Sequence, residues 1–259
     1  MLVGAGKALR IYDLGKKKLL RKTENRNFPV QICWLGSRGD RIYVGDIANS
    51  FHFVKFRRAE KQLVIFADSF VPRYLTSCEI LDFATVAAGD KFGNICISRL
   101  PDDASDDIEI DPFTSEFAYA SDGFLNSAPS KLVDISNFYV GDTVTHLKRI
   151  SFIPGEEGVL FYCTLQGALG ILIPFIERAD IDFFSHLEMH LRQHSSPLCG
   201  RDHMAFRSYY SPVKDVIDGD LCEQFYALSF NKQQEIATEL MCEPNDVIRK
   251  LEEMRSKFL

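Results

Sequence analysis

The sequence lacks the features that identify several classes of protein. Its seven cysteines are odd in number and widely spaced, and no two of them form a Cys-x-x-Cys pair. This usage argues against a disulfide framework and against a zinc ribbon. No apolar run is long enough to cross a bilayer, so we expect no contact with a membrane. The cysteine pattern favours reduced thiols in a cytosolic or nuclear protein.

Sequence motifs of catalysis are missing as well. Gly6 and Lys7 resemble the end of a phosphate-binding loop, but the next residue is Ala8 rather than Ser or Thr. The Gly-x-Ser-x-Gly motif of serine nucleophiles does not occur. We therefore expect no catalytic residues, no enzymatic activity and no small-molecule substrate.

Three histidines, His186, His190 and His194, stand one helical turn apart, a spacing that can chelate zinc. Glu188 lies between the first two, but the metalloprotease motif needs the Glu directly after its first His. Other side chains with metal-binding atoms follow in the sequence: Cys199 and His203. On a helix, His186 and His190 fall away from the apolar face, as residues that contact water or a neighbour do. We expect neither a metal nor a cofactor here.

The net charge of −6 is spread unevenly along the chain. Residues 1–58 carry 13 Lys and Arg against 4 Asp and Glu, whereas residues 59–259 carry 17 against 32. One interpretation is that the basic stretch faces RNA or an acidic partner. Its contacts would be Lys16, Lys17, Lys18, Arg21, Lys22, Arg57 and Arg58. The other interpretation is a hairpin turn at the three lysines and solvated strand faces elsewhere.

A repeat runs through the first two thirds of the chain. Two apolar strands separated by a Gly or polar turn recur, with Gly4, Gly45, Gly89 and Thr164 as landmarks at intervals of 41, 44 and 75 residues. A period in the low forties, built from four short strands, is typical of β-propeller blades. We expect the glycines at the turns to supply the positive φ that tight hairpins need.

The long third interval has a simple explanation. Residues 101–127 are acidic and poor in strand-forming residues, which predicts a loop inserted between two strands of one blade. Three strands are expected in residues 1–27, four in 28–70, four in 71–140 and three in 141–175. Two full and two partial blades cannot close a ring, so we expect the missing blades to come from elsewhere in a longer chain or from another polypeptide.

After Phe175 the pattern becomes helical. Ile181, Phe184, Leu187 and Leu191 recur at helical spacing, which predicts one buried face. Asp202 is placed to begin a short helix, and Asp220 with Glu223 fits a capping box. The fold class is therefore mainly β with a C-terminal α part: propeller blades over residues 1–175 and a small helical domain over residues 176–259.

Three segments of the helical part carry a resemblance to a known family: Asp182–His190, Pro197–Ala205 and Val213–Phe225. They resemble the splicing factor 3b subunit 3 branch of a family that also includes the large damaged-DNA-binding subunit and the largest cleavage and polyadenylation specificity factor subunit. The wider family shares chiefly the element from Asp218 to Leu221. The motif residues, and hence candidate partner contacts, are His186, Glu188, His190, Arg201, Asp202, His203, Asp218, Gly219 and Asp220.

The resemblance implies a non-catalytic scaffold subunit in the nucleus. It implies the closing blades of the last of three seven-bladed, WD-like propellers, with the missing strand and blades supplied by the rest of the full-length chain. It also implies membership of the splicing factor 3b complex of the U2 small nuclear ribonucleoprotein, which selects branch sites in pre-mRNA splicing. The implied partners are the helical-repeat subunit 1 and the small subunit 5. Direct RNA binding and a ubiquitin-ligase adaptor role remain the alternatives.

Overall fold

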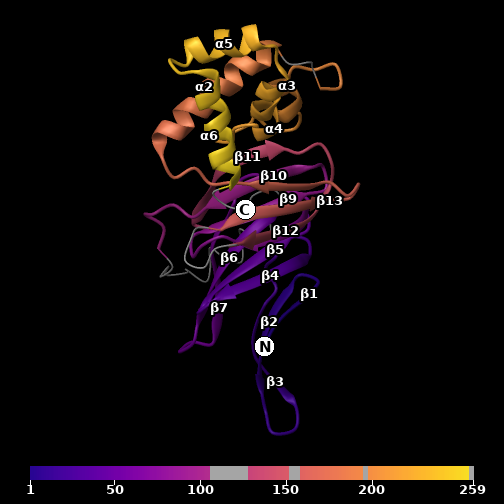
Figure 1. Cartoon of the computed structure of the whole chain (residues 1–259). Coiled ribbons are helices and arrows are strands. Elements are labelled where there is room, and N and C mark those ends of the chain that lie inside the picture. Colours follow the sequence, from indigo (N-terminus) through magenta and orange to yellow (C-terminus); the bar gives the residue numbers. More distant parts are fainter. Residues whose placement is uncertain (106–127, 152–157, 195–197, 257–259) are drawn as a thin grey trace.

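The computed structural model describes residues 1–105, 128–151, 158–194 and 198–256. The strands all lie before Phe175 and the helices with given bounds all follow it, as the sequence predicts (Figure 1). Most of the acidic segment expected as a loop, residues 106–127, falls outside the described residues. The strands on either side of it pair with each other, so the segment is an insertion within one sheet. Among the described helices, none has the length and apolar character of a membrane span.

The strands form three sheets in the part of the chain that is described. The first holds β1 (Leu2–Ala5), β2 (Ala8–Leu14) and β3 (Leu19–Asn25). The last holds β12 (Val144–Ile150), β13 (Val159–Thr164) and β14 (Leu169–Leu172). In both sheets neighbouring strands are antiparallel and follow the chain order. These are the three-strand groups expected in residues 1–27 and 141–175.

The middle sheet has eight strands in the order β4-β5-β6-β7-β11-β10-β9-β8. Its first half is β4 (Ile32–Arg38), β5 (Arg41–Asp46), β6 (Ser50–Arg57) and β7 (Gln62–Ser69). Its second half is β8 (Leu75–Ile80), β9 (Thr85–Asp90), β10 (Asn94–Arg99) and β11 (Ser130–Tyr139). Each half is an antiparallel meander, and a short parallel pairing of β7 with β11 joins them. The mostly β architecture fits a partial propeller.

The hydrophobic cores lie between successive meanders. Along β5, Ile42 and Val44 belong to the core shared with the first sheet, whereas Tyr43 belongs to the core shared with β8 and β9. Successive side chains of a strand point to opposite faces, so a strand buried on both faces serves two cores at once. A third core lies between β9, β10 and the last sheet, where Ile95 meets Leu147. The sheets are therefore stacked face to face.

The repeat glycines mark the places where neighbouring meanders touch. Gly4, Gly45 and Gly89 lie inside β1, β5 and β9, and each faces the first strand of the next meander. A Cβ added to each would lie 2.7 Å from Cγ2 of Ile32, 3.2 Å from Cδ1 of Leu75 and 2.5 Å from Cγ1 of Val144, respectively. The sequence therefore repeats at the interval at which one meander comes into close contact with the next.

Glycines in the hairpin turns do supply positive φ, as expected, at Gly6, Gly39 and Gly93. The landmark glycines Gly4, Gly45 and Gly89 are not among them, because they lie inside strands. The turn after β9 is closed by the side chain of Asp90. Its Oδ1 accepts hydrogen bonds of 2.9 Å from the backbone amides of both Phe92 and Asn94.

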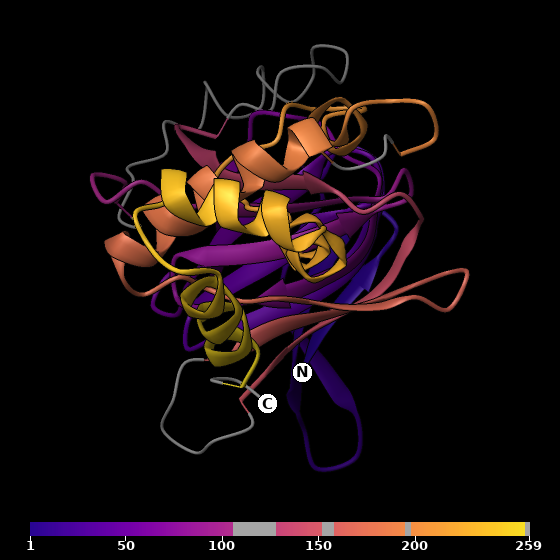
Figure 2. The same ribbon diagram turned by 45° about the horizontal axis from the view of Figure 1, so that its top comes forward.

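The helices gather at the end of the molecule away from β3 (Figures 1 and 2). They are α2 (Arg178–His194), α3 (His203–Arg207), α4 (Gly219–Cys222), the 3-10 helix η1 (Glu223–Ala227), α5 (Phe230–Glu239) and α6 (Pro244–Ser256). Phe184, Leu187 and Leu191 of α2 enter a separate core with η1, α5 and α6. Burial of such side chains contributes about 2 kcal/mol each. Ile181 is 41% exposed, unlike the other three residues of the predicted face.

Candidate functional site

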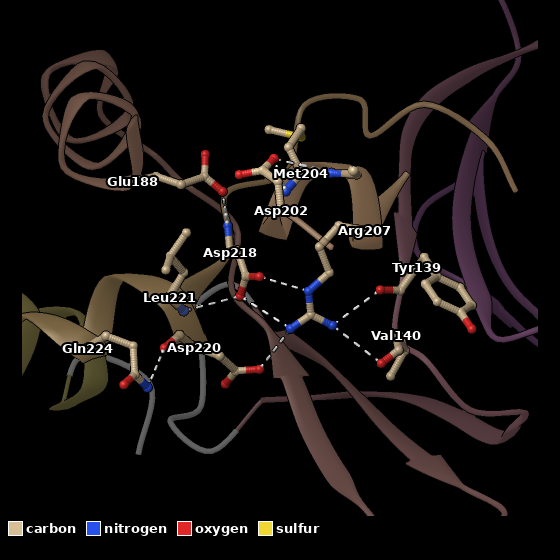
Figure 3. Close-up of polar contacts among 11 residues, drawn as sticks. Tyr139, Val140, Glu188, Asp202, Met204, Arg207, Asp218, Asp220, Leu221 and Gln224 are labelled. Atoms are coloured by element: carbon tan, nitrogen blue, oxygen red, sulfur yellow. Dashed lines mark hydrogen bonds and ion pairs between the residues drawn. The ribbon is translucent and has the colours of Figure 1, made fainter. Parts of the chain in front are cut away.

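The motif residues converge where the helices meet the end of β11, and Arg207 of α3 is at the centre (Figure 3). Its Nε donates to Asp218 Oδ2 at 2.7 Å, and its Nη2 lies 3.2 Å from Asp220 Oδ2. On the other side, Nη1 donates to the backbone carbonyls of Tyr139 at 3.2 Å and Val140 at 3.3 Å. One guanidinium therefore ties the helical part to the sheet.

Asp218 is almost fully buried and serves as the N-cap of α4. Its Oδ1 accepts a 3.3 Å hydrogen bond from the amide of Leu221, and its own amide donates to Glu188 Oε1 at 2.8 Å. Asp220 was predicted to be the capping residue. It lies instead in the first turn of α4, and its carboxylate turns toward Arg207. Burial raises the pKa of Glu188, although the hydrogen bond from the amide of Asp218 opposes the rise.

Asp202 positions the helix that carries Arg207. As the predicted N-cap of α3, its carboxylate accepts hydrogen bonds from the amides of Met204 and Ala205. The same oxygen accepts a 2.8 Å bond from Arg192 of α2, and this bond lowers the pKa of Asp202. α3 is thus held at its first residue and, through Arg207, at its last.

A second contact joins the two parts of the chain. Lys214 pairs with Asn137 of β11 through two backbone hydrogen bonds, of 3.1 and 3.0 Å. The side-chain amide of Asn137 also donates to the carbonyl of Pro212 at 3.0 Å. Together with Arg207, these bonds dock the segment between α3 and α4 on β11.

The cluster around Arg207 is packed. Phe138, Glu188, His203 and Asp218 are among the side chains that line it, and they leave no room between them for a water-sized molecule. The arrangement is therefore suited to holding two parts of the chain together rather than to holding a small ligand.

Of the remaining motif residues, His203 and Gly219 belong to this cluster, whereas His186 and Arg201 lie outside it. His186 is exposed on α2, and the guanidinium of Arg201 lies 4.7 Å from the ring centroid of Tyr209. His203 is buried in the lining, and Gly219 opens α4 with free space around it. The structure thus brings together Glu188, Asp202, His203, Asp218, Gly219 and Asp220 and leaves the exposed His186 apart.

Two of the three histidines of α2 have partners of their own. His190 Nδ1 lies 2.7 Å from Glu239 of α5, and His194 Nδ1 lies 3.1 Å from the ammonium of Lys232. Within the described ranges, no three His, Cys, Asp or Glu side chains are grouped as a metal site would require.

Four of the seven candidate RNA contacts are engaged in ion pairs. Their pairs are Arg21 with Glu24 at 2.6 Å, Lys22 with Asp13 at 3.1 Å, Arg57 with Glu60 at 3.3 Å and Arg58 with Asp40 at 2.7 Å. Lys16, Lys17 and Lys18 are exposed in the turn between β2 and β3. The leucines beside this turn are exposed too, and Leu14 is 88% exposed.

Sequence reasoning missed Arg207. It carries no motif of its own and stands eleven residues before Asp218, so only the fold shows that the two meet.

Comparison with known proteins places these observations in a family. The model of the CPSF A subunit region matches residues 1–227. The chain is 54% identical over 259 residues to a probable splicing factor 3B subunit 3 of Dictyostelium discoideum. It is equally similar to spliceosome-associated protein 130 A of Arabidopsis thaliana, and it is 50% identical over 258 residues to splicing factor 3B subunit 3 of Danio rerio. All of this chain is covered, but it spans only 20–21% of the length of these relatives. The resemblance expected from the motifs is confirmed.

Proposed function

This chain belongs to the family of the CPSF A subunit region, and we propose that it acts as a non-catalytic scaffold in pre-mRNA splicing. The observation that carries the proposal is identity of about one half along the whole chain, helices included, to proteins named as splicing factor 3B subunit 3. The packed contacts of Arg207, which join the helical part to the sheets and which we call the Arg207 joint, support the proposal. A scaffold that holds its partners in a fixed orientation needs its own two parts fixed to each other.

In this proposal the four meanders are consecutive blades of a seven-bladed propeller over residues 1–175, and residues 176–259 form a helical domain docked on it. The acidic insertion of residues 101–127 lies within the third of these blades. The remaining blades belong to a longer polypeptide, in keeping with relatives about five times the length of this chain. The face-to-face cores between the meanders support this interpretation.

The partners that we propose are the other subunits of the splicing factor 3b complex, above all the helical-repeat subunit 1 and the small subunit 5. The place of action is the nucleus, in the U2 small nuclear ribonucleoprotein during branch-site recognition. Contact with the branch-site RNA would then be indirect, through these subunits.

Affinity purification of the tagged protein from its own cells tests this proposal. We expect the splicing factor 3b subunits and U2 small nuclear RNA to co-purify. Recovery of ubiquitin-ligase subunits in their place would move the protein to the adaptor function of the damaged-DNA-binding branch.

A second function, direct RNA binding, is favoured only by the exposed lysines of the β2–β3 turn. If it holds, replacing Lys16, Lys17 and Lys18 with Ala should abolish a salt-sensitive affinity for single-stranded RNA. Filter binding at low ionic strength measures that affinity, and no binding by the unchanged protein would exclude this function.

A further inference from the structure

Five aromatic side chains form a continuous row on the surface beside the Arg207 joint. We call this the aromatic row: Tyr74, Phe92, Tyr210, Tyr139 and Tyr209. Four of its members are about half exposed, at 46% for Tyr74, 41% for Phe92, 48% for Tyr209 and 52% for Tyr210. A contiguous exposed aromatic patch is uncommon on a protein surface without a partner.

Tyr74, Phe92 and Tyr210 contact one another in sequence, and Tyr210, Tyr139 and Tyr209 close the row as a triangle in which each ring contacts the other two. The ring centroids of Tyr74 and Phe92 are 5.8 Å apart, those of Phe92 and Tyr210 are 5.2 Å apart, and Tyr139 lies 5.6 Å from Tyr210. Three pairs of rings are steeply inclined, by 87° between Tyr74 and Phe92, 69° between Tyr139 and Tyr210 and 78° between Tyr209 and Tyr210. The other two pairs are nearer to parallel, at 38° for Phe92 with Tyr210 and 25° for Tyr139 with Tyr209. Inclined rings leave notches between them rather than one flat face.

Hydrogen bonds fix the backbone that carries the aromatic row. Phe92 lies in the turn closed by Asp90, and Tyr139 ends β11, where its carbonyl accepts the bond from Arg207. Tyr209 and Tyr210 directly follow α3, which Arg207 also fixes. Because the rings are largely held in place before a partner arrives, binding costs little side-chain entropy, and this favours affinity.

A cation covers each end of the row. The ammonium of Lys91 lies 3.6 Å from the ring centroid of Tyr74, and the guanidinium of Arg201 lies 4.7 Å from that of Tyr209. These groups occupy ring faces at the two ends, where a nucleic-acid base would otherwise stack. They also place positive charge at both ends of an apolar middle.

We propose that the aromatic row binds an extended, proline-rich peptide with acidic residues at its two ends. Proline rings fit the notches between inclined aromatic rings, and a polyproline II backbone exposes carbonyls that tyrosine hydroxyls can donate to. Such a peptide is ordered before binding, so little conformational entropy is lost. The acidic ends complement Lys91 and Arg201. The ring centroids lead from Tyr74 through Phe92 and Tyr210 to Tyr209 over at most about 16 Å, so at a rise of about 3.1 Å per residue roughly five residues cover the row.

Single-stranded RNA fits this surface less well. Stacking platforms for bases combine open ring faces with a positively charged groove. Among the described residues, the cations over these rings are Lys91 and Arg201, and the chain as a whole carries a net charge of −6. The inference does not depend on the splicing role, because peptide binding is measured on purified protein in the absence of other splicing subunits.

The test is a calorimetric titration of residues 1–259, purified together with the remaining propeller of a full-length relative, with a synthetic peptide of about four prolines between acidic ends. We expect saturable binding that is lost when alanines replace the prolines. Tyr210→Ala should weaken binding about tenfold, as loss of an aromatic anchor does. Lys91→Glu should weaken binding of the acidic-ended peptide but not of one with neutral ends.

Tyr226→Ala is the matched control, since Tyr226 is 42% exposed on η1, outside the row. It should leave the affinity unchanged. Circular dichroism confirms that each variant is folded. Failure of the proline peptide to bind, equal binding by Tyr210→Ala, or displacement of the peptide by oligouridylate from these rings would overturn the proposal. None of these results bears on purification with the splicing subunits.

Discussion

At the residue scale, two buried side chains that can carry a positive charge stand in opposite surroundings. Arg207 has acceptors from two aspartates and two backbone carbonyls. His52 of β6 is 1% exposed, and neither of its ring nitrogens has a hydrogen-bond partner among the described residues. The fold therefore stabilises the charge on Arg207 and disfavours a charge on His52.

Arg207→Met should lower the free energy of unfolding by about 3–5 kcal/mol, because it leaves the carboxylate of Asp218 buried without its partner. Urea denaturation of the variant and the unchanged protein measures the difference. In the double variant that also carries Asp218→Asn, part of the loss should be recovered. A loss below about 1 kcal/mol would mean that the joint contributes little.

Acid should destabilise the fold through His52. Burial lowers the pKa of His52 to about 4 from an ordinary 6.5. Below pH 6.5 the imidazole of His52 therefore binds a proton in the unfolded chain but stays neutral in the folded chain. The free energy of unfolding falls as the pH drops toward 4. The loss should approach about 3 kcal/mol, since one pKa unit corresponds to about 1.4 kcal/mol.

The comparison that isolates this effect is His52→Leu. Protonation of carboxylates in acid destabilises the unchanged protein and the variant alike. The difference between their free energies of unfolding at pH 7, 6, 5 and 4 therefore reports His52 alone. Between pH 7 and pH 4 this difference should shift by about 3 kcal/mol in favour of the His52→Leu variant. Curves that stay parallel over this range would show that His52 is not buried in its neutral form.

At the element scale, the glycines inside β1, β5 and β9 set how closely the meanders approach. Gly89→Ala should destabilise the protein by about 1–3 kcal/mol, because its Cβ would lie 2.5 Å from Val144 and overpack that contact. Gly219→Ala is the control, as nothing lies within 4 Å of the added carbon. Thermal unfolding of both variants makes the test, and equal melting temperatures would contradict it.

The elements themselves were accessible from the sequence, but the reason for the repeat was not. Alternation and spacing predict the strands, and Asp202 is recognisable as a cap because capping depends on local chemistry. Gly45 in a strand and Gly39 in a turn look alike in sequence, since glycine suits both a close approach and a positive φ. Arg207 and Asp218 meet only through the docking of α3 on β11, which no local pattern encodes.

At the scale of the whole molecule, both outer sheets end in exposed strands. Among the described strands, β14 pairs only with β13, and its Leu169 is 69% exposed. We expect the isolated chain to bind a fluorescent hydrophobic dye or to self-associate, because such edges pair readily with other chains. Co-expression with the remaining propeller of a full-length relative should suppress both effects. A monomer of residues 1–259 that unfolds cooperatively and binds no dye would show that the edges are protected.

The basic hairpin and the helices lie at opposite ends of the molecule (Figure 1), and this separation gives the protein an electric dipole. The hairpin of residues 8–25 carries six Lys and Arg against two Asp and Glu, while residues 176–259 carry ten Lys and Arg against fifteen Asp and Glu. In the electric field of a charged partner, this dipole orients the protein before the two molecules touch. An acidic partner would therefore first meet the end formed by β2 and β3. Added salt would slow such encounters and leave the lifetime of the complex nearly unchanged.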